Sequence, residues 1–179
     1  MKLVIVRHLP TAWNAEDRLQ GRQDIPIIPL DDAALARLVK QIEQVRTAGP
    51  FDAVYCSTLS RTRKTAELFG YADPISDPLL DEIDFGEFEG HLRGEMLAKV
   101  GKAWLVAPET LAFGEAVTNL GERAKQFVRK NLVHGRVLAF GHGGWTRALS
   151  SIKRTGSVAQ MNQLTIANGE AISFEFDSI

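Results

Sequence analysis

A short run of apolar, mostly β-branched residues opens the chain: residues Leu3–Val6 read Leu-Val-Ile-Val. Such a run is typical of a strand buried on both faces, as in the parallel sheets of α/β proteins. The run ends at Arg7 and His8, and Leu9-Pro10 then forces the backbone into an extended or turning path. Open α/β sheets place their ligands at the carboxyl ends of strands, so Arg7 and His8 stand where a ligand site is expected. The alternative is that these two residues only mark where the strand meets solvent.

Strand and helix patterns alternate along the rest of the chain. This alternation predicts a three-layer α/β/α sandwich with a mostly parallel central sheet and helices on both faces. Further strands are expected at 51–56, around residue 75 and at 136–140. Helices are expected at 31–46, 60–70, 115–132 and 145–152, and two short helical segments lie between 93 and 106. An apolar stripe along the first of these helices is predicted to be core: Leu35, Leu38, Val39 and Ile42.

Capping and turn residues predict the remaining features. Asp31 and Ser60 precede helical patterns and are expected as N-caps. Asn168-Gly169 separates two apolar stretches, 164–167 and 171–176, and predicts a C-terminal β-hairpin. Residues 9–29 are rich in proline and poor in periodic apolar residues, so they are expected to form a loop. A loop of that length in a compact domain is usually functional.

Length and composition favour a single soluble domain over residues 1–179. The 45% hydrophobic content suits a globular protein. A net charge of −1 argues against nucleic acid or an anionic membrane as the main partner. The amino end carries too short an apolar segment for a secretory signal, and no stretch approaches membrane-spanning length. Cys56 is the only cysteine, so no internal disulfide can form, and a cytoplasmic location is expected.

Reactive side chains follow three of the predicted strands. Arg7-His8 follows the first, Ser57 and Arg61 follow the second, and His142 follows the strand at 136–140. Parallel strands bring their carboxyl ends to one edge of the sheet, so these residues are expected to converge. Arginine offers planar donors that match phosphate, and a neutral imidazole nitrogen can attack phosphorus. The pattern therefore favours a phosphate site.

Five sequence blocks resemble the histidine phosphatase superfamily, also called phosphoglycerate mutase-like. They occur in the family's order and span nearly the whole chain. The blocks are Arg7-His8 with Thr11 and Asn14, followed by Gln20-Gly21-Arg22; Cys56 to Arg61, continuing to Thr65-Ala66-Glu67; Leu80 to Gly90; Gly114-Glu115 with Arg123; and Gly141 to Gly144 with Arg147. The short chain resembles the family's phosphatase branch more than its mutases, which carry an added lid segment.

The resemblance implies a role for each matching residue. His8 would be the nucleophile that accepts the phosphoryl group, and Glu82 would be the general acid and base. Arg7, Arg61 and His142 would hold the phosphate oxygens. The substrate entrance would be shaped by Thr11, Asn14, Gln20, Gly21 and Gly143. The family is metal-independent, so neither a metal nor a cofactor is implied.

Several residues compete for these roles. Asp84 is the alternative acid to Glu82, because both lie on one acidic loop. Arg147 is interpreted as structural or peripheral. Glu115 is either a helix cap or part of the pocket wall, and His91 and His134 are expected at the surface. Glu82 is favoured over Asp84, because Leu80 precedes it and Gly86 follows it as in the family's loop.

The chain departs from the family pattern at Leu9-Pro10, where the family usually has glycine and then often an acidic residue. Proline has no N–H to offer a phosphate. We expect the pocket to adapt, because the catalytic residues are kept. The expected activity is that of an acid-type phosphatase on a small phosphorylated metabolite, for example α-ribazole phosphate or a sugar phosphate. A phosphoglycerate mutase-type transferase and a weakened phosphate-binding or regulatory module are the alternatives, and the sequence leaves monomer or dimer open.

Overall fold

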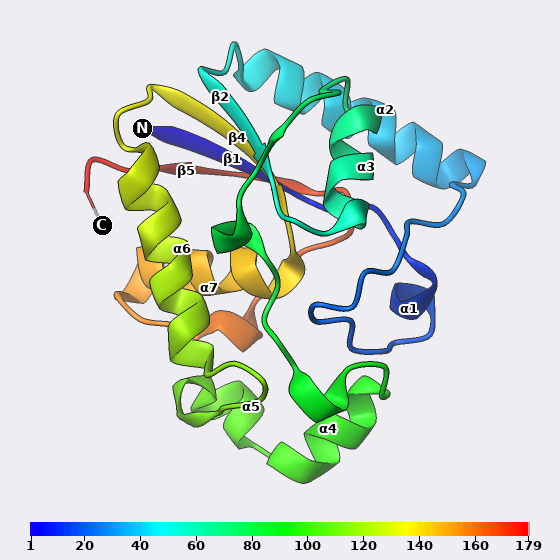
Figure 1. Cartoon of the computed structure of the whole chain (residues 1–179), viewed down its shortest axis with the longest axis vertical. Coiled ribbons are helices and arrows are strands. Elements are labelled where there is room, and N and C mark those ends of the chain that lie inside the picture. The colour runs from blue at the N-terminus through cyan, green and yellow to red at the C-terminus, as the bar shows by residue number, and fades with distance from the viewer. Residues whose placement is uncertain (179) are drawn as a thin grey trace.

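The computed structural model describes residues 1–178 and contains a five-stranded sheet in the order β3-β2-β4-β1-β5 (Figure 1). Four strands are parallel: β1 (Lys2–Arg7), β2 (Ala53–Cys56), β3 (Ile75–Ser76) and β4 (Arg136–Gly141). The fifth, β5 (Ala171–Glu175), pairs antiparallel with β1 at the sheet edge. The predicted α/β fold with a mostly parallel sheet is confirmed.

Helices cover both faces of the sheet, as alternate side chains of β1 show. Leu3 and Ile5 pack in one cluster with residues of α6 (Val117–Asn131) and α7 (Gly143–Thr155). Val4 and Val6 pack on the opposite face with residues of α2 (Asp32–Ala48) and α3 (Ser60–Leu68). Burial of both faces explains why the β1 sequence is a continuous apolar run.

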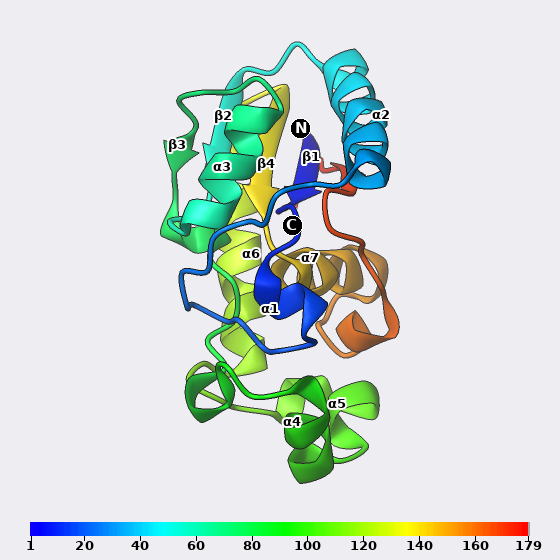
Figure 2. The ribbon, with the colours of Figure 1, turned by 90° about the vertical axis from the view of Figure 1, so that its right-hand side faces the viewer.

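The cap of the molecule lies beyond the sheet, where Figure 2 shows α4 and α5 gathered at one end. It consists of α4 (Arg93–Val100) and α5 (Ala103–Val106), and α1 (Ala12–Ala15) lies in the loop that follows β1. Single 3₁₀ turns complete the described chain: Pro78–Leu80, Gly86–Phe88, Pro108–Thr110 and Met161–Gln163. No helix in the described part of the chain is long and apolar enough to cross a membrane.

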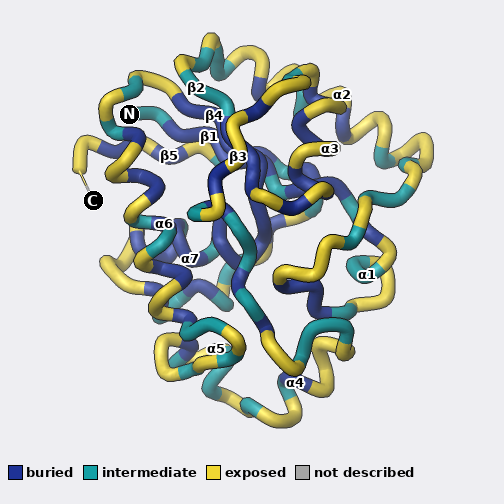
Figure 3. The backbone as a smooth tube through the Cα atoms, viewed as in Figure 1, coloured by how far each residue is buried: buried dark blue, intermediate teal, exposed yellow. Residues whose placement is uncertain are grey.

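The apolar stripe on α2 is only partly core. Leu38 is buried, but Leu35 and Val39 are 45% and 66% exposed, so their predicted burial is wrong. Figure 3 shows most of α2 as exposed, because only one side of this helix rests on the sheet. The expected N-cap Asp31 is confirmed, since its Oδ1 accepts a hydrogen bond from the Ala34 N–H at 2.7 Å.

Ser60 does not cap α3. Leu59 holds the N-cap position of that helix, and the Ser60 hydroxyl donates instead to Asp24 Oδ1 at 2.7 Å. The prediction that α3 starts near Ser60 is confirmed, and the prediction that the Ser60 hydroxyl caps the helix is wrong.

The predicted C-terminal hairpin is also wrong, because residues 164–167 form no strand. The polar groups of this segment bind the end of β1. The Ile166 carbonyl accepts from Arg7 Nη1 at 2.5 Å, and the Gly169 N–H donates to the Arg7 carbonyl at 3.0 Å. The Asn168 amide donates to the His8 carbonyl at 2.9 Å. The segment therefore does not pair as a hairpin strand. Its hydrogen bonds hold Arg7 and His8 in position instead.

Candidate active site

A pocket of about 490 Å³ opens at the carboxyl end of the sheet. Most of the residues expected from the sequence line it: Arg7, His8, Asn14, Gln20, Gly21, Arg61, Glu82 and Gly143. Thr11 and His142 do not line it. The convergence of side chains from β1, from the α3 start and from the α7 start follows from the parallel sheet.

His8 lies in this pocket with one ring nitrogen available. The side chain is 3% exposed, and Nδ1 donates to the Leu9 carbonyl at 2.7 Å. A carbonyl only accepts hydrogen bonds, so the proton is on Nδ1 and Nε2 keeps its lone pair. Burial, together with the charges of Arg61 and Arg7, holds the pKa of His8 well below 6.5. His8 is therefore a neutral imidazole near pH 7.

Leu9, the departure from the family pattern, serves this arrangement. Its carbonyl fixes His8, its N–H donates to Thr65 Oγ1 at 2.9 Å, and its side chain is buried in the core on the α2 side of the sheet. Among the described non-glycine residues only Asp17 has a positive φ, so Leu9 is not strained by lacking glycine's freedom. Leu9-Pro10 is accommodated without loss of the His8 hydrogen bond.

Arg61 and His142 form a buried pair behind His8. Arg61 Nε donates to His142 Nδ1 at 3.3 Å, and His142 Nε2 bonds Ser57 Oγ at 2.8 Å. The rings of His8 and His142 lie 5.3 Å apart between centroids. Both nitrogens of His142 thus have protein partners, whereas the resemblance to the family predicts direct contact with phosphate.

Each terminal nitrogen of Arg61 donates one hydrogen bond to the loop after β1. Nη1 donates to the Gln23 carbonyl at 2.6 Å and Nη2 to the Gly21 carbonyl at 2.7 Å. Burial lowers the pKa of Arg61 to about 10. That value keeps the guanidinium charged at neutral pH, and the carbonyls hold its plane at the pocket wall.

The two buried histidines predict a pH-dependent stability. Burial, then Arg61, holds the pKa of His142 well below 6.5, as for His8. The unfolded chain therefore binds more protons than the folded chain once the pH falls below about 6.5. We expect the free energy of unfolding to be level from about pH 7 upward. Below pH 6.5 it should fall by roughly 1.4 kcal/mol per pH unit for each histidine.

Urea unfolding between pH 7.5 and 5.5 measures this dependence. In His142→Asn, which removes one of the two groups, the slope should be about half that of the unaltered chain. A stability that rises or stays level as the pH falls through this window contradicts buried neutral histidines.

Glu82 is the acidic-loop carboxylate that faces the pocket. Its Oε2 accepts from the Gly144 N–H at 2.8 Å and its Oε1 from the Trp145 N–H at 2.9 Å. These amides belong to the first turn of α7, whose N–H groups have no partner within the helix. The start of α7 therefore holds the Glu82 carboxylate at the wall of the pocket that His8 also lines.

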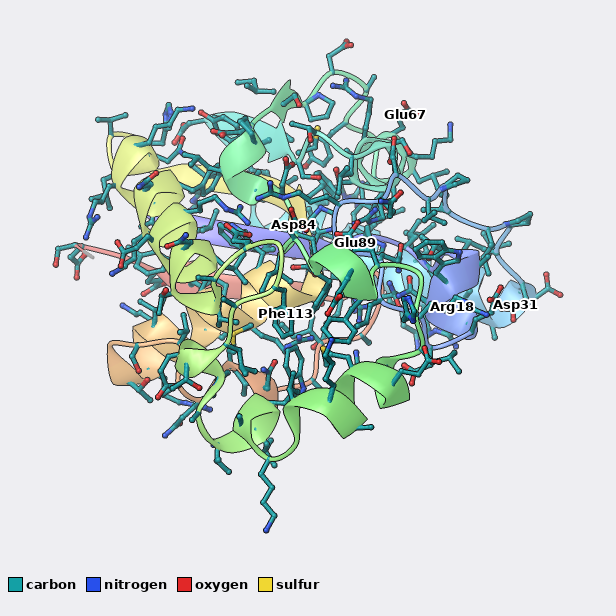
Figure 4. The ribbon with its side chains drawn as sticks, turned by 60° about the horizontal axis from the view of Figure 1, so that its bottom comes forward. Arg18, Asp31, Glu67, Asp84, Glu89 and Phe113 are labelled. Atoms are coloured by element: carbon teal, nitrogen blue, oxygen red, sulfur yellow. The ribbon has the colours of Figure 1, made fainter. Side chains whose placement is uncertain are left out.

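The other carboxylates of the region have structural partners. Asp84 and Glu89, both labelled in Figure 4, follow Glu82 along the acidic loop but do not line the pocket. Asp84 Oδ1 accepts from the Gly86 N–H, and Glu89 Oε1 from the Arg22 N–H. Glu115 pairs with Arg123 at 2.7 Å and neither caps α6 nor lines the pocket. Of the two acids that the sequence left open, Glu82 has the position for contact with a ligand.

Thr11 is a helix cap. Its side chain is fully buried and accepts from the Asn14 N–H at 3.2 Å at the start of α1, while Asn14 Oδ1 accepts from the Thr11 N–H at 3.1 Å. The expected contact between Thr11 and substrate is replaced by this capping box, which places Asn14 at the pocket. Gln20 also lines the pocket, and its buried Oε1 has no hydrogen-bond partner.

Arg147 also lines the pocket, so its interpretation as peripheral is wrong. Arg93 and Trp104 from the cap and Arg18 from the loop after α1 line it too, and none of these side chains was expected in the site from the sequence. Arg147 follows Gly143 by four residues on α7, so both face the same side of that helix. That spacing was the available signal for Arg147.

No cluster of three or more His, Cys, Asp or Glu side chains suited to a metal occurs among residues 1–178. The pocket is lined instead by guanidinium groups, with Glu82 as its one carboxylate in the described chain. Such a lining stabilises a bound oxyanion.

The chain is similar in sequence to proteins named as phosphatases and as probable phosphoglycerate mutases. The chain is 32% identical to 2-carboxy-D-arabinitol-1-phosphatase of Triticum aestivum over 158 residues, covering 83% of this chain and 31% of that protein. An acid phosphatase of Mycobacterium tuberculosis is 27% identical over 99% of this chain and 84% of its own. A probable phosphoglycerate mutase GpmB of Proteus mirabilis is 30% identical over 80% and 70%, respectively. The chain thus spans about a third of the wheat protein and most of the two bacterial ones.

The fold has solved counterparts. The protein of open reading frame Rv3214 from Mycobacterium tuberculosis superposes with a TM-score of 0.83 at 25% identity, over 98% of this chain and 91% of that one. The family model of the histidine phosphatase superfamily (branch 1) matches residues 3–178. With a match over that length, and with the two histidines side by side at the end of the sheet, the chain belongs to the histidine phosphatase superfamily.

Proposed function

We propose that this chain is a phosphomonoester hydrolase that acts through a phosphohistidine on His8. The observation that carries the proposal is the hydrogen bond from His8 Nδ1 to the Leu9 carbonyl. It leaves the Nε2 lone pair free in a pocket lined by arginines. A neutral, oriented imidazole beside cationic donors is what nucleophilic attack on a phosphate ester requires.

The reaction has two steps. His8 Nε2 attacks phosphorus, the bond from phosphorus to the ester oxygen breaks, and Glu82 gives that oxygen a proton. Glu82 then takes a proton from water, which attacks the phosphohistidine, breaks the P–N bond and releases inorganic phosphate. Arg7 and Arg61 stabilise the charge of the phosphoryl oxygens in both steps. Arg7 Nε is buried without a partner, so it has a donor to give.

His142 acts in this account as a positioning residue. It holds Arg61 Nε and packs beside the His8 ring. Asn14, Gln20 and Gly143 contribute polar groups to the pocket wall. The substrate is a small phosphorylated metabolite, because His8 is buried in a pocket whose wall includes Arg93 and Trp104 of the cap.

A mutase is the second candidate, favoured by the relative named as a probable phosphoglycerate mutase. A mutase must keep water from the phosphohistidine until a second hydroxyl takes the phosphoryl group. Here the cap of the described chain consists of two short helices, α4 with eight residues and α5 with four. Hydrolysis is therefore the better supported outcome.

Product analysis during turnover of an aryl phosphate separates these functions. The proposal predicts release of inorganic phosphate as the main product, even with 3-phosphoglycerate present as acceptor. Passage of the phosphoryl group to a second hydroxyl would identify a transferase. Binding of inorganic phosphate with no turnover of any monoester would identify a phosphate-binding module.

Gly144→Ala tests whether activity depends on the position of Glu82, because Gly144 lies in the first turn of α7 and its N–H binds that carboxylate. A Cβ at Gly144 would lie 2.4 Å from Glu82 Oε1, so the carboxylate must move. Alanine favours a helix by roughly 1 kcal/mol over glycine, so we expect the variant to fold. Steady-state hydrolysis of an alkyl phosphate should fall at least about tenfold. Gly94→Ala is the matched control, because a Cβ at Gly94 enters open space; equal activity of both variants would argue against Glu82.

A further inference from the structure

A second chamber of about 440 Å³ adjoins the phosphate pocket. Arg7, Arg93, Arg147 and Trp104 line both spaces, so these side chains form the boundary between them. The far wall is built from the segment after α7, which includes Asn162 and Thr165. A molecule bound at His8 could extend past Arg147 into this chamber.

The lining of the chamber is cationic, and the ion-pair partner of Arg93, Asp17 at 3.5 Å, lies outside that lining. Three of its lining side chains are arginines and none is Asp or Glu. Arg7 and Arg147 meet at Gly143, where a Cβ would lie 3.1 Å from Arg7 Nε and 3.5 Å from Arg147 Nη1. Each guanidinium group is thus near Gly143, and the charge of Arg7 opposes that of Arg147, so an anion bound beside both would relieve their repulsion.

The hydrogen bonding of Arg147 is incomplete. Its Nη2 donates to Asn162 Oδ1 at 3.3 Å, which is a neutral acceptor, and its Nε is buried with no partner. Burial, opposed by Glu82 and reinforced by Arg93 and Arg7, lowers the pKa of Arg147 to about 10. Glu82 is not its ion-pair partner, because the α7 amides bind that carboxylate. An unpaired buried donor on a charged group is costly, so the site favours an anionic ligand.

We propose that this chamber binds a carboxylate on the non-reacting part of the substrate, with Arg147 as the residue that selects it. The inference rests on the proposed phosphatase function and narrows it to small phosphomonoesters of carboxylic acids. The free Nε edge of a planar guanidinium matches a carboxylate through two parallel hydrogen bonds. Arg7 lies between the two spaces and would contact both anionic groups of such a substrate.

Matched ligand pairs test the proposal. 3-Phosphoglycerate and glycerol 3-phosphate differ by a carboxylate in place of a hydroxymethyl group, and phosphoserine and phosphoethanolamine differ by a carboxylate in place of hydrogen. The dissociation constant of each is measured by calorimetry on the full-length His8→Asn chain, which lacks the proposed phosphoryl acceptor, so the ratio does not depend on turnover. We expect the carboxylate member to bind roughly 10- to 100-fold more tightly in both pairs.

Two variants in the chamber distinguish a specific effect of Arg147 from an effect of the overall charge of the protein. Arg147→Met keeps the side-chain volume, and Thr165→Asp places a competing carboxylate at an exposed position of the chamber wall. Each should lower the binding ratio at least about fivefold. Arg154→Met on α7 and Gln163→Asp in η4 (Met161–Gln163) make the same charge changes at residues that do not line the chamber and should leave the ratio unchanged.

The results have distinct readings. Equal binding of both members of each pair, or equal loss in the chamber variants and their controls, overturns the carboxylate site. In that case hydrolysis of an aryl phosphate by the unaltered chain would still support the proposed function. Absence of hydrolysis of every monoester, with an intact binding ratio, would instead overturn the phosphatase and keep the carboxylate site.

Discussion

His8→Asn should abolish hydrolysis, lowering kcat for an aryl phosphate by at least about 10⁴-fold, because the proposed phosphoryl acceptor is removed. Asparagine can keep the hydrogen bond to the Leu9 carbonyl, since its amide nitrogen stands near the position of Nδ1. The variant should therefore retain the fold, and its far-ultraviolet circular dichroism and urea midpoint at pH 7.5 should stay close to those of the unaltered chain.

His91→Asn is the control for the loss of a histidine. His91 is exposed and pairs with Glu95 on α4, away from the pocket. We expect unchanged kcat and KM in this variant. A His8→Asn protein that is folded and keeps more than a tenth of the activity would contradict His8 as nucleophile.

Glu82→Gln should lower kcat by roughly 10²–10⁴-fold for an alkyl phosphate, the range expected for a positioned acid–base group. With p-nitrophenyl phosphate the leaving group departs without a proton, so the first step should be affected less. Attack of water on the phosphohistidine still needs the base. We therefore expect the variant to give a burst of p-nitrophenol, measured by rapid mixing, followed by slow turnover.

Asp84→Asn controls for the charge of the acidic loop. Asp84 holds the Gly86 N–H and lies outside the pocket, so its loss should affect stability more than kcat. If Asp84→Asn shows the larger fall in kcat and Glu82→Gln shows no burst, Asp84 would carry the acid–base role instead.

The fold was predictable where burial imposes a pattern along the chain. β1 and β4 are buried on both faces, so each is a continuous apolar run that the sequence displays directly. The hairpin failed for the opposite reason. Asn168-Gly169 is a strong local turn signal, but the partners of this segment are the Arg7 and His8 backbone, which lie far away in sequence.

The part of the site that could be predicted is the set of residues that come directly after the carboxyl ends of the strands. Arg7, His8 and Arg61 converge as the parallel sheet requires. Arg147 was missed because a lone arginine within an amphipathic helix is usually at the surface, and only the tertiary structure shows it meeting Arg7 at Gly143. Thr11 was misassigned because a motif position does not tell whether a hydroxyl caps a helix or faces a ligand.

The central claim is that His8 carries the phosphoryl group. It is tested most directly by quenching Glu82→Gln protein in alkali during turnover of a radiolabelled aryl phosphate and locating the label by peptide mapping. We predict an alkali-stable, acid-labile phosphoryl group on the peptide that contains His8, and no such label when His8→Asn is combined with Glu82→Gln. An acid-stable label, or a label on any other residue, would contradict the account.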